Sequence, residues 1–182
     1  MLPALAAALA AGALLTGCAD SQPAAILPAT STPLSAPPGT VPSANSPSQA
    51  VIAAYTAYFP ATKAAENGPA APAEAILAPY AQQPYLGQVL AQMATYRSRG
   101  EDAAGYVIVH VTKVTAYGKD ATVHDCQDAS HAALASARTQ TVIPGTSGRA
   151  GTYLIASLTL GGDGRWRLTS LTHVAVPCSP AA

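Results

Sequence analysis

The chain has 182 residues, with nine basic and nine acidic side chains and a formal net charge of zero at pH 7. This length leaves room for one domain with a real hydrophobic core once the terminal segments are set aside. The sparse and balanced charge argues against the basic surface that nucleic acids or a polybasic membrane contact require. We therefore expect no nucleic-acid partner.

The first 17 residues have the pattern of an export signal. An apolar run from Leu2 to Ala13 is short for a membrane span and leads into Leu15-Thr16-Gly17-Cys18. This motif resembles the bacterial lipobox, whose cysteine receives a diacylglyceryl group and becomes the first residue of the mature protein. We therefore expect a signal peptide over residues 1–17 and a lipid on Cys18, which would anchor the protein to the extracytoplasmic face of the cell membrane. The alternative is a signal peptide without lipidation.

Residues 18–45 have the composition of a linker. They are rich in proline, alanine, serine and threonine and carry little apolar surface to bury. Such a composition predicts an extended, disordered tether between the anchored cysteine and a folded domain. The domain itself is predicted over residues 46–178, followed by a short tail at 179–182.

The first half of the domain is predicted to be helical. Ser46 is a suitable N-cap, Pro47 fits the first helical position, and Gln49 completes a capping box. Pro60 predicts a kink or the end of the first section, and Asn67-Gly68-Pro69 ends the helix. Further helices are predicted at Pro72–Ala78 and from near Pro84 to Gly100. One apolar face of the first helix comprises Val51, Ile52, Tyr55, Tyr58, Phe59 and Thr62.

The second half has the two-residue period of strands. Tyr106–Tyr117 alternates with one change of phase, which predicts a β-bulge near Thr112 and Lys113. Ala121–Asp128 is predicted to place Ala121, Val123 and Asp125 on one side and Thr122, His124 and Cys126 on the other. The segment His131–Arg138 fits a strand or a helical turn equally.

Two more strands, Tyr153–Leu160 and Trp166–Val176, flank a glycine-rich turn. Helices followed by an antiparallel meander predict an α+β domain, with N-terminal helices packed on a curved antiparallel sheet of about four strands.

The chain has three cysteines. With Cys18 assigned to the lipid, Cys126 and Cys178 remain as a pair in a compartment outside the reducing cytosol, which predicts a disulfide. The alternative is two separate buried thiols.

Several motifs occur in a characteristic order: Tyr55 and Tyr58 on a capped helix, Asp125-Cys126-Gln127-Asp128 on a strand, a loop from Gly145 to Arg149, Gly162-Asp163-Gly164-Arg165-Trp166, and Pro177-Cys178. Together they resemble a family of uncharacterised actinobacterial secreted proteins and lipoproteins, over residues 46–178. The resemblance implies the nuclear transport factor 2-like (cystatin-like) cone fold and a Cys126–Cys178 disulfide, and no established activity. The family often has a bulky residue after the second aspartate, where this chain has Ala132, Ala133 and Leu134.

Enzymes that share the cone fold include ketosteroid isomerases and polyketide cyclases, which use a carboxylate base with a tyrosine or a second carboxyl group. Tyr55 or Tyr58 with Asp125 or Asp128 would be the equivalent groups here. The alternative is that the tyrosines belong to the core and that the aspartates cap a turn or bond beside the disulfide. Fold analogy alone is a weak argument for activity.

Other kinds of site have little support in the sequence. His124, Asp125, Asp128 and His131 would be candidate metal ligands, but adjacent residues on a strand point in opposite directions, and His110 and His173 lie on other strands. We therefore expect no metal and no cofactor. Trp166 between Arg165 and Arg167 is either a stacking site for a ligand or a core residue.

These observations favour a lipid-anchored envelope protein whose domain is a non-catalytic binding or assembly module for an envelope protein or a small apolar ligand. The alternative function is a small-molecule isomerase or cyclase that uses Tyr55 or Tyr58 with Asp125.

Overall fold

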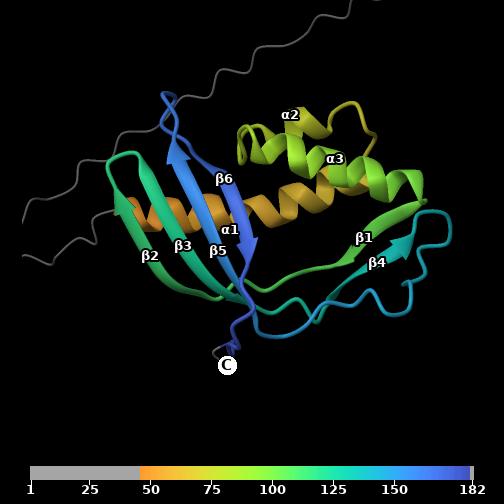
Figure 1. Ribbon diagram of the computed structural model, residues 1–182. Coiled ribbons are helices and arrows are strands. Elements are labelled where there is room, and N and C mark those ends of the chain that lie inside the picture. The colour runs from red at the N-terminus through yellow and green to blue at the C-terminus, as the bar shows by residue number, and fades with distance from the viewer. Residues whose placement is uncertain (1–45, 181–182) are drawn as a thin grey trace, which may run out of the picture. The chain divides into compact units, whose positions relative to one another are not determined.

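The computed structural model describes residues 46–180, which form an α+β domain (Figure 1). Three helices come first in this part of the chain: α1 (Pro47–Asn67), α2 (Ala73–Leu77) and α3 (Tyr85–Ser98). The strands that follow are β1 (Glu101–Gly105), β2 (Val111–Tyr117), β3 (Asp120–Gln127), β4 (Ala132–Ser136), β5 (Thr152–Leu160) and β6 (Trp166–His173). The predicted fold class is confirmed.

Two antiparallel sheets are present in the described domain. One has four strands in the order β2-β3-β5-β6, and the other pairs β1 with β4. The chain passes between the sheets three times, from β1 to β2, from β3 to β4 and from β4 to β5. A bridge between Ile108 and Asp128 joins the first two of these connections. At the far edge of the larger sheet, Ala81 forms a parallel bridge with Leu168 of β6.

Helix α1 begins at the predicted capping box. The Gln49 backbone N–H donates to Ser46 Oγ and the Ser46 N–H donates to Gln49 Oε1, both at 3.3 Å. Of the two outcomes predicted at Pro60, a kink or an end, the end is wrong, because the helix continues through Pro60 to Asn67. Proline removes a single backbone donor, and the neighbouring Phe59 and Ala61 pack against the core, which holds the helix together across this point.

The core lies between the helices and one face of the larger sheet. Val51, Tyr55 and Tyr58 of α1 are buried, as the apolar stripe predicts. They share a cluster with side chains of α2, α3 and the sheet, which includes Leu77, Met93, Val123, Ala156, Leu158, Trp166 and Leu168. Each large aliphatic side chain buried in this way contributes about 1.5–3 kcal/mol.

Several strand boundaries differ from the predicted ones, and β2 begins at Val111 rather than at Tyr106. The bulge in β2 is confirmed, because the register with β3 shifts between Val111 and Lys113. The segment Glu101–Gly105 forms the unpredicted strand β1, and the uncertain segment near Ala132 forms its partner β4. Gly105 permits this pairing: its φ is 71° and a Cβ there would lie 1.7 Å from the His131 carbonyl oxygen. The last strand ends at His173 rather than Val176.

The predicted disulfide between Cys126 and Cys178 is confirmed, with 5.9 Å between the Cα atoms. Cys126 lies near the end of β3, and Cys178 follows β6. Because β5 lies between β3 and β6 in the sheet, the bond ties the C-terminal segment to a strand that is not its neighbour.

The predicted signal peptide (1–17), the predicted lipidation site Cys18 and the predicted linker (18–45) lie outside the described residues. Within residues 46–180, none of the helices combines the length and the apolar character needed to cross a membrane.

Candidate functional site

Tyr55 and Asp125 meet in the core. The Tyr55 hydroxyl donates to Asp125 Oδ2 at 2.8 Å, and the His110 backbone N–H donates to Asp125 Oδ1 at 2.7 Å. Both side chains are fully buried, at 0% exposure. The structure therefore brings together two of the candidate catalytic residues.

Their environment keeps the pair closed to solvent. Burial raises the pKa of Tyr55 far above its ordinary value, and the neighbouring Asp125 carboxyl group adds to that rise. Burial also raises the pKa of Asp125, against the hydrogen bonds from Tyr55 and His110, which favour the carboxylate. Neither residue lines the two cavities described below. A general base must reach a substrate proton, so this geometry fits a structural hydrogen bond better than a catalytic pair.

Tyr58 has a different partner. Its hydroxyl lies 2.8 Å from the Tyr85 hydroxyl on α3, and burial raises the pKa of Tyr58. It lines a cavity of about 390 Å³ between α1 and α3, together with Tyr85, Gln88, Val89, Gln92, Met93 and Leu171. Tyr58 thus forms its hydrogen bond with Tyr85 and not with Asp125.

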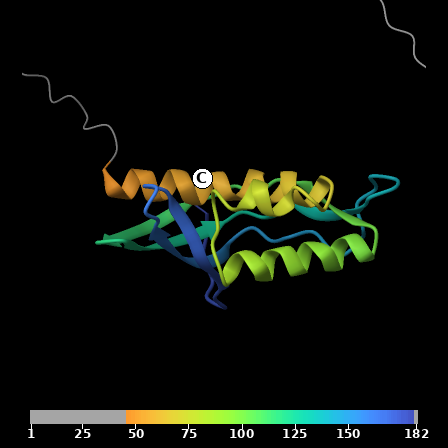
Figure 2. The same ribbon diagram turned by 90° about the horizontal axis from the view of Figure 1, so that it is seen from above.

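A larger cavity of about 880 Å³ opens beside the second half of α1. Its opposite wall consists of β1, β4 and the segment 106–109 between β1 and β2. In Figure 2, α1 and α3 lie apart at this end of the domain, and other segments of the chain are seen between them. The apolar lining includes Phe59, Pro60, Ala103, Ala104, Val107, Ile108, Val109, Ala132, Ala133 and Leu134.

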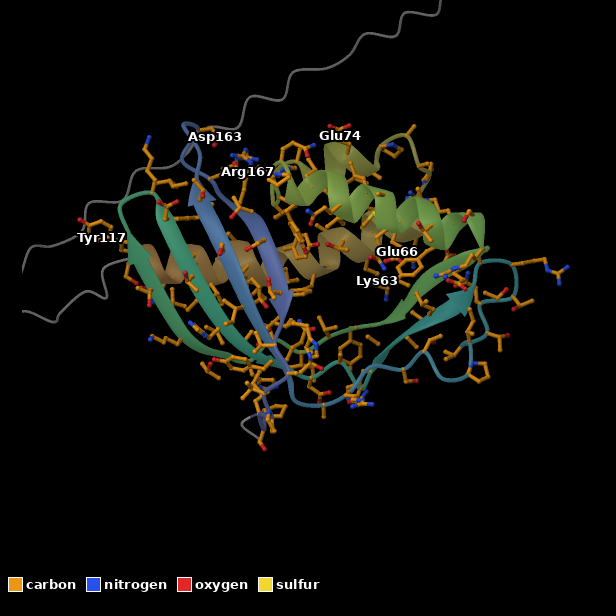
Figure 3. All side chains as sticks on the ribbon, in the orientation of Figure 1. Lys63, Glu66, Glu74, Tyr117, Asp163 and Arg167 are labelled. Atoms are coloured by element: carbon orange, nitrogen blue, oxygen red, sulfur yellow. A yellow bond between two sulfur atoms is a disulfide. The ribbon has the colours of Figure 1, made fainter. Side chains whose placement is uncertain are left out.

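Two charged side chains of α1 also line this larger cavity. Lys63 Nζ donates to the Gly105 carbonyl oxygen at 2.5 Å, and Lys63 is otherwise exposed. Glu66 is 8% exposed, and its buried Oε1 atom has no hydrogen-bond partner among the described residues. In Figure 3 both side chains lie between α1 and β1, whereas Glu74 projects from α2 on the other side.

Glu66 stands at the junction of the two cavities. It lines both of them, together with Thr62 and Tyr96. Burial raises the pKa of Glu66, the nearby Arg97 opposes that rise, and Asp102 adds to it. Arg97 also donates to the Ala65 carbonyl oxygen and so connects α3 to α1.

Lys63 and Glu66 were not predicted as site residues. Their positions continue the helical stripe through Phe59 and Thr62, since 59, 62, 63 and 66 fall at intervals of three and four. An ionisable residue that extends the apolar face of a helix is the signal that would have found Glu66.

The candidate metal ligands have other partners. His124 Nδ1 lies 2.9 Å from the Tyr153 hydroxyl, Asp128 accepts from the Ser130 N–H at 2.8 Å, and the His131 ring stacks on Tyr106. Within residues 46–180, no three His, Cys, Asp or Glu side chains are grouped so as to hold a metal ion.

Trp166 belongs to the core, at 8% exposure. The adjacent Arg167 pairs with Asp163 at 2.6 Å and donates to the Ala78 carbonyl oxygen at 2.8 Å, so it braces the turn before β6. The structure therefore places the tryptophan as a core residue rather than as a stacking surface for a ligand.

No protein-family model matches the chain, and no curated protein sequence matches it significantly. Among solved structures, it is similar to the crystal structure of the intermembrane space region of the chloroplast protein ARC6, with a TM-score of 0.54 and 14% identity. That match covers 72% of this chain and 99% of the other. A designed β-sheet protein solved by NMR matches with a TM-score of 0.35 and 18% identity, over 70% of this chain and 88% of the other. At such identities the ARC6 likeness shows a shared fold and nothing about function.

Proposed function

We propose that this protein is a cell-envelope lipoprotein, anchored through Cys18, whose domain is a non-catalytic module that binds a small apolar ligand. The observation that carries the binding role is the larger cavity, about 880 Å³ in volume and lined mainly by apolar side chains. Ligand pockets have volumes of roughly 300–1,000 Å³ and combine an apolar lining with a few polar groups.

The closed Tyr55–Asp125 pair supports a non-catalytic role. An isomerase of the kind considered above would need the tyrosine and the carboxylate at the wall of an open cavity. Here the two side chains are fully buried and satisfy each other, whereas the open cavity lies farther along α1.

Binding is tested by titrating the full chain with N-phenyl-1-naphthylamine, a neutral apolar dye whose fluorescence rises in apolar surroundings. We expect saturable binding by the wild-type protein. Ala133→Phe, which places a ring in the cavity, should weaken binding by about tenfold, which corresponds to about 1.4 kcal/mol. Ala53→Phe, on an exposed position of α1, is the matched control and should bind like the wild type. Absence of saturable binding, or equal weakening by both variants, would contradict the proposed role.

The anchor is tested separately by expressing wild-type and Cys18→Ser chains in the native host. Lipidation at Cys18 predicts that the wild-type protein sediments with membranes and carries the added mass of the lipid. The variant should lose both properties. Equal membrane association of the two proteins would overturn the assignment of Cys18.

A further inference from the structure

The lining of the larger cavity includes two charged side chains of α1. Lys63 and Glu66 lie one turn apart on α1, and both face this cavity. Glu66 lies at the junction with the smaller cavity, whereas Lys63 remains exposed. A ligand in the cavity therefore meets a carboxyl group in its interior and an ammonium group nearer to solvent.

Glu66 has an unfilled hydrogen-bonding capacity. Its side chain is more than nine-tenths buried, and Oε1 has no partner among the described residues. A buried oxygen without a partner has lost its hydration and has gained no hydrogen bond in return. A ligand group that donates to Oε1 would supply that hydrogen bond.

Lys63 offers the complementary group. An ammonium group has three N–H donors, and one of them is bonded to the Gly105 carbonyl oxygen. The remaining donors are directed to solvent or to whatever occupies the cavity. The site thus presents an acceptor and donors to the same ligand.

The surrounding charges oppose a charged ligand of either sign. An anion would lie beside the buried Glu66 carboxyl group, with Asp102 close enough to influence it. A cation would lie beside Lys63, and Arg97 acts on the Glu66 carboxyl group from α3. In an apolar setting each unbalanced charge would lose its hydration without adequate compensation.

We propose that the cavity takes an uncharged amphiphile, with an aliphatic body along the apolar lining and a hydroxyl group that donates to Glu66 Oε1. This inference rests on the proposed binding function and adds the chemical class of the ligand. A hydroxyl group suits the site because it carries no charge and can donate the one hydrogen bond that Glu66 Oε1 lacks.

The test measures displacement of N-phenyl-1-naphthylamine from the full chain by 1-decanol, decanoate and decylammonium. The alcohol is used below its solubility limit and the two charged probes below their micelle concentrations. These probes share a chain length and differ in the charge of the end group. We expect 1-decanol to displace the dye at a concentration about tenfold lower than either charged probe. Preference for decanoate or decylammonium, or equal displacement by all three, would overturn the inference.

Variants of Glu66 identify the group responsible. Glu66→Leu should weaken 1-decanol binding by about tenfold while the dye still binds, and Glu66→Gln, which keeps an acceptor oxygen, should stay within about threefold of the wild type. Glu74→Leu on α2 makes the same change outside both cavities and should have no effect.

The two proposals fail differently in this experiment. If the dye binds but the alcohol shows no dependence on Glu66, the ligand class is wrong and the binding function stands. If the wild-type chain binds neither the dye nor any of the decyl probes, the binding function itself is wrong.

Discussion

Replacing Tyr55 by phenylalanine should destabilise the domain through the loss of one hydroxyl group. The change keeps the aromatic ring, which packs edge-on against Phe59 with 5.2 Å between the ring centres. It removes the donor that lies 2.8 Å from Asp125 Oδ2 and leaves that oxygen facing an apolar ring. The remaining donor to the carboxyl group is the His110 backbone N–H.

The size of the effect follows from the burial of both partners. Tyr55 and Asp125 are at 0% exposure, so water cannot replace the lost hydroxyl without a rearrangement of the core. An unsatisfied buried acceptor costs roughly 1–3 kcal/mol, with more for a charged group. We therefore expect a loss of about 2–3 kcal/mol, which at a urea m-value of about 2 kcal/mol/M lowers the midpoint by about 1–1.5 M.

Urea denaturation followed by circular dichroism measures this loss. Tyr117→Phe removes the same hydroxyl group from a side chain that is 88% exposed, and its free energy of unfolding should stay within about 0.5 kcal/mol of the wild type. If the two variants unfold at the same urea concentration, the Tyr55–Asp125 hydrogen bond does not stabilise the fold as described.

Two further changes test other parts of the structure. Cys126→Ser should lower the free energy of unfolding by about 4 kcal/mol on the chain-entropy model, and a reductant should not change the stability of this variant. If the wild-type protein melts at the same temperature with and without reductant, the disulfide does not stabilise the fold. Glu66 has a raised pKa in the folded state, so its contribution to stability is complete below the ordinary value of 4.5 and is lost as pH rises through the raised pKa. Urea denaturation at a series of pH values measures this dependence. As pH rises above about 4.5, the free energy of unfolding of Glu66→Gln should fall less than that of the wild type. The free energy of unfolding of Glu74→Gln should follow the wild-type dependence on pH. Parallel curves for all three proteins would show that Glu66 is not perturbed.

The elements with strong local patterns were predictable from the sequence. Helix α1 has a capping box at Ser46 and an apolar stripe, and both are present in the structure. The alternation along β3 placed Asp125 on the same side as Val123, and both are buried. In each case the spacing of apolar residues along the chain decides which face of the helix or strand meets the core.

The elements that depend on distant partners were not predictable in the same way. The sequence Glu-Asp-Ala-Ala-Gly at 101–105 has low strand propensity and becomes β1 only because β4 pairs with it. The larger cavity lies between this pair and α1, so its existence depends on a strand that local patterns do not reveal. Glu66 was missed for a related reason: its burial comes from tertiary packing, and a glutamate near the end of a helix usually faces solvent.

The two outer edges of the four-stranded sheet bear on solubility. A chain with no net charge has little electrostatic repulsion to keep copies apart, and an open strand edge is a template for pairing between molecules. At one edge, β2 carries a bulge and Lys113, both of which hinder the docking of a flat strand. At the other edge, the backbone around Ala81 bonds to Leu168 of β6, so part of the edge is already occupied. The segment between α2 and α3 therefore protects the protein against edge-to-edge aggregation, in addition to linking two helices.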